Sequence, residues 1–229
     1  MSEPTLTPAL LDFLGELADH NERDWFKANQ PRYEATVREP VRAFVRSMIP
    51  VLADYAPALT ADDRKVGGSM MRPQRDTRFS KDKTPYKTQV GIQFRHSAGK
   101  DVHAPGLYLN LAPGEIFLGL GMWRPPSPDL KAIRAAIDAD PQEWTAIVHD
   151  PGLEGAWSLH QTDVLKRNPR GYDKEHPMGE WLRLKSHILI VDLEPEQVFD
   201  PGFLDYLADQ LERGRRHAAF ICGALGQPW

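Results

Sequence analysis

The spacing of the apolar residues changes along the chain from a helical period to a strand period. Between residues 7 and 55, apolar side chains recur every three or four positions, as in Leu10, Phe13, Leu14 and Leu17. Between residues 90 and 122 they alternate with polar or small residues. The first spacing is typical of amphipathic helices and the second of half-buried strands. Helices are therefore predicted first and a sheet afterwards.

The first third is predicted to be helical. After a helix that begins near Pro8, a short helix is expected over residues 23–29, and Pro31 can begin a third that continues to about residue 55. Pro40 lies inside that third helix and lacks the N–H that an internal turn needs. We expect this helix to kink or split near Arg38.

The middle of the chain is predicted to form adjacent strands over residues 90–94, 107–111 and 116–122. Pro113 and Gly114 join the last two as a hairpin loop. Farther along we expect helices that begin at Ser127 and Pro141, a long ordered loop over 163–180, a helical turn over 180–184, a strand over 187–193 and a final helix over 201–225 interrupted at Gly214.

These elements predict one α+β domain over residues 1–229, with an antiparallel or mixed sheet flanked by helices. Its parts are a helical region of about 7–55, a sheet-rich middle of about 66–123 and a mixed C-terminal part. No Pro/Gly/Ser-rich linker divides the chain. The strict alternation of strands and helices found in doubly wound nucleotide-binding folds is absent.

Composition narrows the cellular setting. The single cysteine, Cys222, cannot form an internal disulfide. No stretch approaches the roughly 20 apolar residues of a membrane span, and the N-terminal segment lacks a basic signal-peptide region. We expect a cytoplasmic protein without a membrane partner.

Charge is strongly polarised along the chain. Residues 64–100 hold ten Lys and Arg against two Asp, a net charge of +8, while the other residues hold 18 Lys and Arg against 30 Asp and Glu, a net −12. The total of −4 therefore conceals a basic segment in an acidic body. A broad polyanion would be repelled by that body, but a confined anion site is compatible with it.

The basic segment centres on residues 72–87, where Arg is suited to bidentate contact with phosphate or carboxylate. We predict an anion site there, with hydroxyl groups as neutral donors. Its candidate residues are Arg72, Arg75, Arg78, Ser80, Lys81, Lys83, Tyr86 and Lys87. Alternatively, water or the chain's own acidic helices neutralise these cations, and Tyr86 is a packing residue.

Two further groups are candidates for the same site. Asp76 and Asp82 are the only carboxylates inside the basic segment and can act as an acid or base or can orient an arginine. His176, Arg183 and Lys185 form a possible second wall if their stretch folds against residues 72–87.

No motif predicts a metal site or a cofactor. The eight histidines form no H-x-x-x-H pair. Gly119 and Gly121 lie in an alternating strand and not at the start of a helix, so close strand packing explains them better than dinucleotide binding. Ser80 and Lys83 match S-x-x-K, but the partner motifs of penicillin-binding enzymes are absent.

Four longer motifs resemble a known family. They are NERDWFKANQPRYE at 21–34, RDTRFSKDKTPYKT at 75–88, GLGMWRPPSPDLKAIRAAI at 119–137 and HPMGEWLRLKS at 176–186. Together they resemble the DUF2461 family over most of the chain, with one small departure at His20-Asn21, where paired asparagines are frequent. The resemblance implies one intact domain and implies no activity.

Three hypotheses about function remain open from the sequence. The first is binding of a phosphate-bearing ligand around residues 72–87, with a small molecule favoured over nucleic acid. The second is phosphoryl or acyl chemistry in the same pocket. The third is a structural or interaction protein whose basic segment is paired internally. The oligomeric state is left open.

Overall fold

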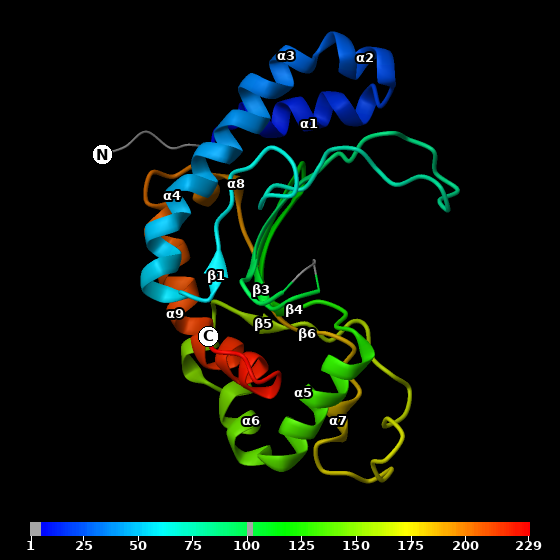
Figure 1. The fold of residues 1–229 in the computed structure, drawn as a ribbon, viewed down its shortest axis with the longest axis vertical. Coiled ribbons are helices and arrows are strands. Elements are labelled where there is room, and N and C mark those ends of the chain that lie inside the picture. Colours follow the sequence, from blue (N-terminus) through cyan, green and yellow to red (C-terminus); the bar gives the residue numbers. More distant parts are fainter. Residues whose placement is uncertain (1–5, 100–102) are drawn as a thin grey trace.

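The fold is a curved antiparallel sheet with helices behind it and at both ends (Figure 1). The computed structural model describes residues 6–99 and 103–229. Lys100, at the end of the basic segment, lies outside these residues. The α+β prediction is confirmed, with the sheet being antiparallel.

The N-terminal helices follow the predicted pattern closely. They are α1 (Ala9–Asp19), α2 (Arg23–Ala28), α3 (Gln30–Tyr33) and α4 (Glu39–Tyr55). A single π turn over Glu34–Arg38 joins α3 to α4. The expected irregularity near Arg38 is present as this wider turn and not as a break, since Tyr33, Arg38 and Glu39 all keep right-handed helical dihedrals. The turn lies just before Pro40, which cannot donate a backbone hydrogen bond.

The sheet has the strand order β1-β2-β3-β4-β6-β5. A hairpin with Gly114 at φ 78° joins β3 to β4, and β6 pairs with β4 after a long excursion of the chain. The strands are β1 (Leu59–Thr60), β2 (Val90–His96), β3 (Gly106–Ala112), β4 (Glu115–Met122), β5 (Ser158–Leu159) and β6 (His187–Asp192). The two-residue strands β1 and β5 are not predicted from the sequence, because runs this short show no period.

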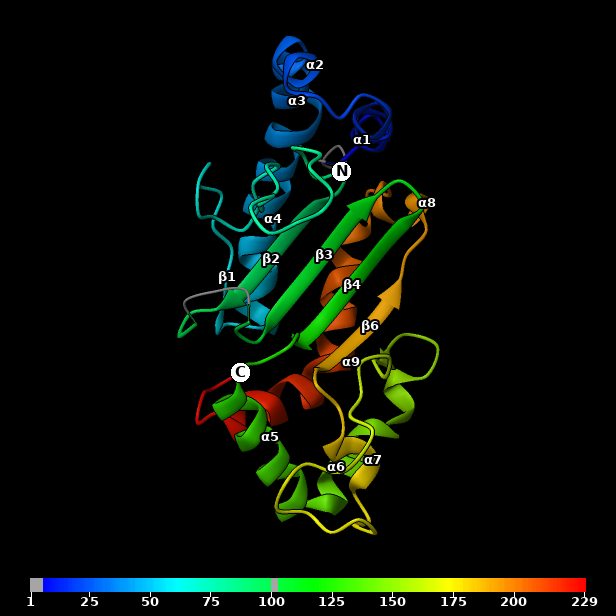
Figure 2. The same ribbon diagram turned by 90° about the vertical axis from the view of Figure 1, so that its right-hand side faces the viewer.

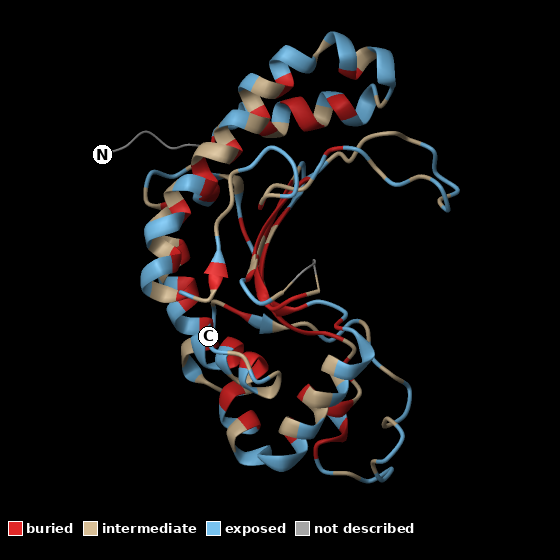
Figure 3. Ribbon diagram, viewed as in Figure 1, coloured by how far each residue is buried: buried red, intermediate tan, exposed pale blue. Residues whose placement is uncertain are grey.

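Helices α4 and α9 (Phe203–Ala224) lie behind one face of the sheet (Figure 2). The leucines of the long strands point into this layer, with Val90, Ile92 and Phe94 of β2, and Figure 3 shows buried residues in this layer. The prediction that Gly214 interrupts the last helix is wrong. Gly214 continues α9, because without a Cβ it lets the Leu120 side chain of β4 approach the helix closely.

A second apolar cluster lies at the C-terminal end of the molecule. Three helices surround it, with the end of α9 and Met122 of β4. Trp144 is its largest fully buried side chain. These helices are α5 (Ser127–Ala139), α6 (Pro141–Val148) and α7 (Gly179–Leu182); a 3-10 turn (Pro151–Leu153) and α8 (Pro195–Val198) lie in the connections.

Candidate functional site

Residues 72–87, the centre of the basic segment, form a two-armed ribbon that leads into the start of β2 (Figure 1). Its two arms are joined by backbone hydrogen bonds from Met71 N to the Gly91 carbonyl (2.9 Å), from Lys87 N to the Pro73 carbonyl (2.7 Å) and from Arg75 N to the Pro85 carbonyl (2.9 Å). These hydrogen bonds order the backbone of residues 72–87 and so position its side chains.

Tyr86 fixes the base of this ribbon to the N-terminal helices. Its ring stacks on Phe26 of α2 with centroids 4.0 Å apart. The Asn21 side chain accepts from the Tyr86 backbone N–H and donates to the Tyr86 carbonyl, both at 3.0 Å. The ring contact matches the packing alternative for Tyr86.

The ribbon's two carboxylates each hold an arginine of the same ribbon. Asp76 pairs with Arg78 at 2.7 Å, and Asp82 pairs with Arg75, which also contacts the Thr84 hydroxyl. Hydrogen bonds from Arg78 lower the pKa of Asp76 to about 2, and those from the Thr84 backbone and Arg75 do the same for Asp82. Both carboxylates stay ionised near neutral pH, which suits orienting an arginine better than acting as a base.

The acidic helices do not supply the neutralising charge for Arg75 and Arg78. Instead, the charges of these two arginines are neutralised by Asp82 and Asp76 of the ribbon itself. Lys83 donates to the Thr77 carbonyl at 2.8 Å, which orders the tip without neutralising the lysine. Ser80 lies at the same tip.

The side chains of three cations in the ribbon have no ion-pair or hydrogen-bond partner among the described residues: Arg72, Lys81 and Lys87. Arg72 and Lys81 are exposed, but Lys87 is half-buried. Burial lowers the pKa of Lys87, and the charge of Arg72 lowers it further. Lys87 lines a hollow of about 600 Å³ together with Asn21, Thr88 and Gln89. The arginine-paired carboxylates Asp76 and Asp82 and the guanidinium of Arg75 line it as well.

The possible second wall lies elsewhere. His176 contacts Asp138 of α5 at 2.9 Å, and Lys185 contacts Asp163 at 2.7 Å. Arg183 donates to Asn168 at 3.4 Å. Figure 1 and Figure 2 place these segments at the end of the sheet opposite the ribbon. The structure does not bring them together with residues 72–87, because the sheet separates the two ends.

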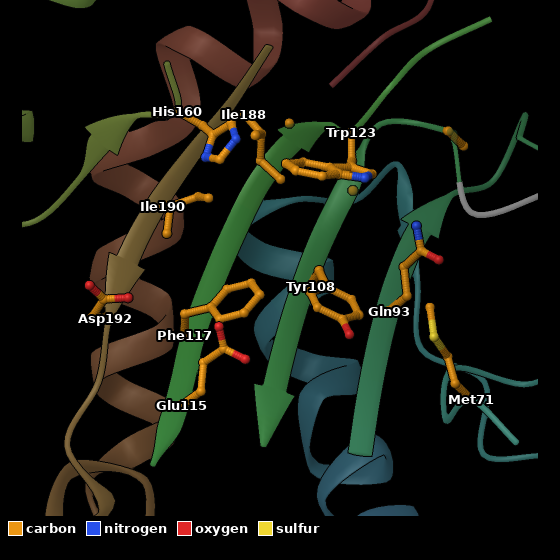
Figure 4. A pocket seen from close by; sticks show the side chains of 13 residues that line it. Met71, Gln93, Tyr108, Glu115, Phe117, Trp123, His160, Ile188, Ile190 and Asp192 are labelled. Atoms are coloured by element: carbon orange, nitrogen blue, oxygen red, sulfur yellow. The ribbon is translucent and has the colours of Figure 1, made fainter. Parts of the chain in front are cut away.

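A second hollow, of about 520 Å³, lies on the face of the sheet that α4 and α9 leave open (Figure 4). Tyr108 of β3 and Phe117 of β4 form its floor, with ring centroids 5.9 Å apart. Trp123 and His160 stand at one end, and Glu115 and Asp192 at the other. Sequence reasoning missed this site, although the small residues that alternate with leucines in β4 were a signal of it.

Comparison with known protein families identifies the family of this chain. A family model described as "Conserved hypothetical protein (DUF2461)" matches residues 9–220. The chain belongs to the DUF2461 family. A search of curated proteins found no match. The family description assigns no activity, so function in this DUF2461 protein has to be argued from its hollows and charges.

Two kinds of site are not found in this DUF2461 protein within residues 6–99 and 103–229. No group of three or more His, Cys, Asp and Glu side chains there is arranged to hold a metal ion. No helix there combines the length and the apolar character needed to cross a membrane.

Proposed function

We propose that this DUF2461 protein binds a phosphate-bearing small molecule in the hollow beside the ribbon, with Lys87 as its main charged contact. One observation carries the proposal. Lys87 is a half-buried ammonium without a carboxylate partner among the described residues, and its nearest charged influence is another cation, Arg72. A phosphate would supply the missing negative charge.

The energetics favour such a ligand. Burial and like charge both disfavour the protonated lysine, as the lowered pKa of Lys87 reports. An anion beside Lys87 would reverse both effects. A charge-assisted hydrogen bond of this kind contributes about 1.5–3 kcal/mol. Thr88 and Gln89 line the same hollow and can add neutral donors.

Fewer residues are proposed to bind the anion than the eight candidates predicted from the sequence. Arg75 and Arg78 already have carboxylate partners, and Lys81 does not line the hollow. Lys87 is therefore the unpaired cation that lines the hollow, and Arg72, outside the lining, is a second unpaired cation close enough to lower the pKa of Lys87. Small ligands fit this arrangement better than nucleic acid does, because two cations set in a body of net negative charge offer no continuous track for a polyanion.

A thermal-shift and calorimetry experiment tests the proposal. The probes are pyrophosphate, ATP, AMP and glucose 6-phosphate, with sodium chloride matched for ionic strength. At a ligand concentration 100 times Kd, stabilisation of about 2.7 kcal/mol should raise Tm by about 5–10 °C. Lys87→Gln should abolish the shift.

Lys81→Gln is the matched control, because it removes the same charge from the same ribbon but outside the hollow. It should retain the shift. The proposal is wrong if no probe shifts the wild-type protein, or if the two variants weaken binding equally, since the second result would indicate attraction by net charge alone.

A further inference from the structure

We infer that the open face of the sheet is a second binding site, which takes a small organic cation with a planar aromatic body. The site is the 520 Å³ hollow of Figure 4. The rings of Tyr108 on β3 and Phe117 on β4 would contact the aromatic part of the ligand. The carboxylates of Glu115 and Asp192, at one end of the hollow, would contact its positive charge. This site is separate from the hollow that Lys87 lines.

Glycines make the aromatic floor flat. A Cβ on Gly91 would lie 2.7 Å from the Tyr108 hydroxyl oxygen, and one on Gly119 would lie 2.8 Å from Cδ1 of Ile188. Either methyl group would force the facing side chain to shift from its present place. The glycines therefore allow the side chains of Tyr108 and Ile188 to lie over the neighbouring strands. As a result, the open face of the sheet is a low surface on which aromatic ring faces are accessible.

The far end of the hollow is also held in place. Trp123 is 40% exposed, and its ring meets His160 edge-on with centroids 5.0 Å apart. Arg124 follows it with a left-handed φ of 43°, and its N–H donates to the Ser186 hydroxyl at 2.9 Å. A non-glycine residue adopts this conformation only where its surroundings hold it. The Arg124 guanidinium lies over the Trp123 ring, 5.6 Å from its centroid, so the indole is in contact with both His160 and Arg124.

Charge decides which aromatic ligand fits. Asp192 pairs in register with Phe117, and Glu115 is two residues before Phe117, so both carboxylates project from the same face next to that ring. Both are exposed, and within the described part of the chain neither has an ion-pair partner. The negative charge of Glu115 reaches the floor, since it adds to the burial that raises the pKa of Tyr108.

No lining residue that the structure describes is a Lys or Arg. Burial lowers the pKa of His160 from 6.5, so this ring is mainly neutral at pH 7. The hollow thus offers two negative charges beside an aromatic floor. An ammonium gains from both, because carboxylates attract it and the negative face of an aromatic ring attracts it as well. Glu115 and Asp192 lack the arginine partners that neutralise Asp76 and Asp82 in the ribbon, so they would repel a phosphate, and the ribbon's ligand does not fit here.

Three probes with one ring and different charges test the inference. They are phenethylamine, phenethyl alcohol and phenylacetate, which are cationic, neutral and anionic at pH 7. Ligand-observed NMR titration at low salt should give binding on the order of millimolar for phenethylamine, as expected for a fragment of this size. The alcohol should bind about tenfold more weakly and phenylacetate more weakly still.

The variants locate the site. Glu115→Gln and Asp192→Asn should each weaken phenethylamine binding about three- to tenfold and leave binding of the alcohol unchanged. Glu154→Gln removes a carboxylate from an exposed turn that does not line the hollow and should change neither. Lys87→Gln should leave phenethylamine binding intact, so failure of the phosphate proposal and failure of this one are separable.

The inference is overturned if phenethylamine does not bind, if phenylacetate binds as well as phenethylamine, or if Glu115→Gln and Asp192→Asn behave like Glu154→Gln. Circular dichroism and Tm of each variant show whether it is folded. Both carboxylates are exposed, so these substitutions should leave the fold unchanged.

Discussion

The two faces of the central sheet are built from the same four long strands and have opposite characters. Leu109, Leu118 and Leu120 point toward α4 and α9 and are almost completely buried. Their neighbours on the other face include Tyr108 and Phe117, which are half-buried, and glycines that keep the surface low. An alternating strand thus specifies a core with one set of residues and leaves the other set free to form a site.

The largest expected effect is a loss of stability at low pH, and it arises on the covered face of the sheet. Two neutral histidines are buried there. His187 of β6 and His217 of α9 pack against Trp144 and form no hydrogen bond to any described residue. Burial lowers the pKa of each from 6.5 to about 3. Below pH 6.5 the unfolded chain takes up protons that the folded chain does not, so stability falls until about pH 3.

Each histidine should remove about 1.4 kcal/mol of unfolding free energy per pH unit in this window. Urea unfolding at several pH values measures the slope. His217→Gln should reduce it by about half, whereas His149→Gln, at an exposed position, should leave it unchanged. An unaltered slope in His217→Gln would show that other groups cause the acid sensitivity.

Neighbouring residues of β4 compare the two faces directly. Leu118→Ala should lower the free energy of unfolding by about 2–5 kcal/mol, because it leaves a cavity in a fully buried layer. Phe117→Ala removes a larger side chain from the open face, yet it should cost under about 2 kcal/mol because the ring is already partly hydrated. Urea denaturation of both variants gives the comparison, and equal losses would mean that the open face is covered in solution.

Two glycines on the open face should respond differently to the same methyl group. Gly121 has φ 129°, and a Cβ there would overlap the His187 carbonyl of the adjacent strand, so Gly121→Ala should cost about 1–3 kcal/mol. Gly119→Ala meets only the flexible end of Ile188 and should cost under about 1 kcal/mol. Thermal unfolding measures both; a reversed order would contradict the backbone contact.

The smallest effect concerns the ribbon, where charges are exposed and titrate without unfolding the protein. The pKa values of Asp76 and Asp82 lie near 2, so their pairing is complete above the ordinary value of 3.8 and is lost as the pH falls through 2. Carboxyl-carbon NMR of the wild type should show this low midpoint. Arg78→Gln should raise the pKa of Asp76 toward 3.8 and leave that of Asp82 in place.

The positions of helices and strands along the chain could be predicted from the sequence far better than which of them pack or pair together. Alternation located β2, β3 and β4, and the prolines located the helix starts, because both signals are local. The pairing of β4 with β6 across a long excursion has no local signal. Gly214 was misread because propensity says that glycine weakens a helix, whereas the contact with Leu120 explains its presence.

The candidate site was predicted only as a set of residues. Its charges were visible in the sequence, but the pairing of Asp76 with Arg78 and of Asp82 with Arg75 depends on the course of the ribbon. That pairing is what leaves Lys87 without a partner. His176 contacts Asp138 of α5, and the sheet lies between α5 and the ribbon, an arrangement that spacing in the sequence does not reveal.

The shortness of β1 and β5 has a consequence for self-association. Backbone groups along the rim of a sheet can recruit strands from other molecules and start aggregation. Here each rim strand is two residues long, and Ser69 and Met71 use their backbone groups to cover the next part of β2. The molecule can therefore hold one broad surface of its sheet open to solvent at high concentration while giving other copies almost no rim on which to grow.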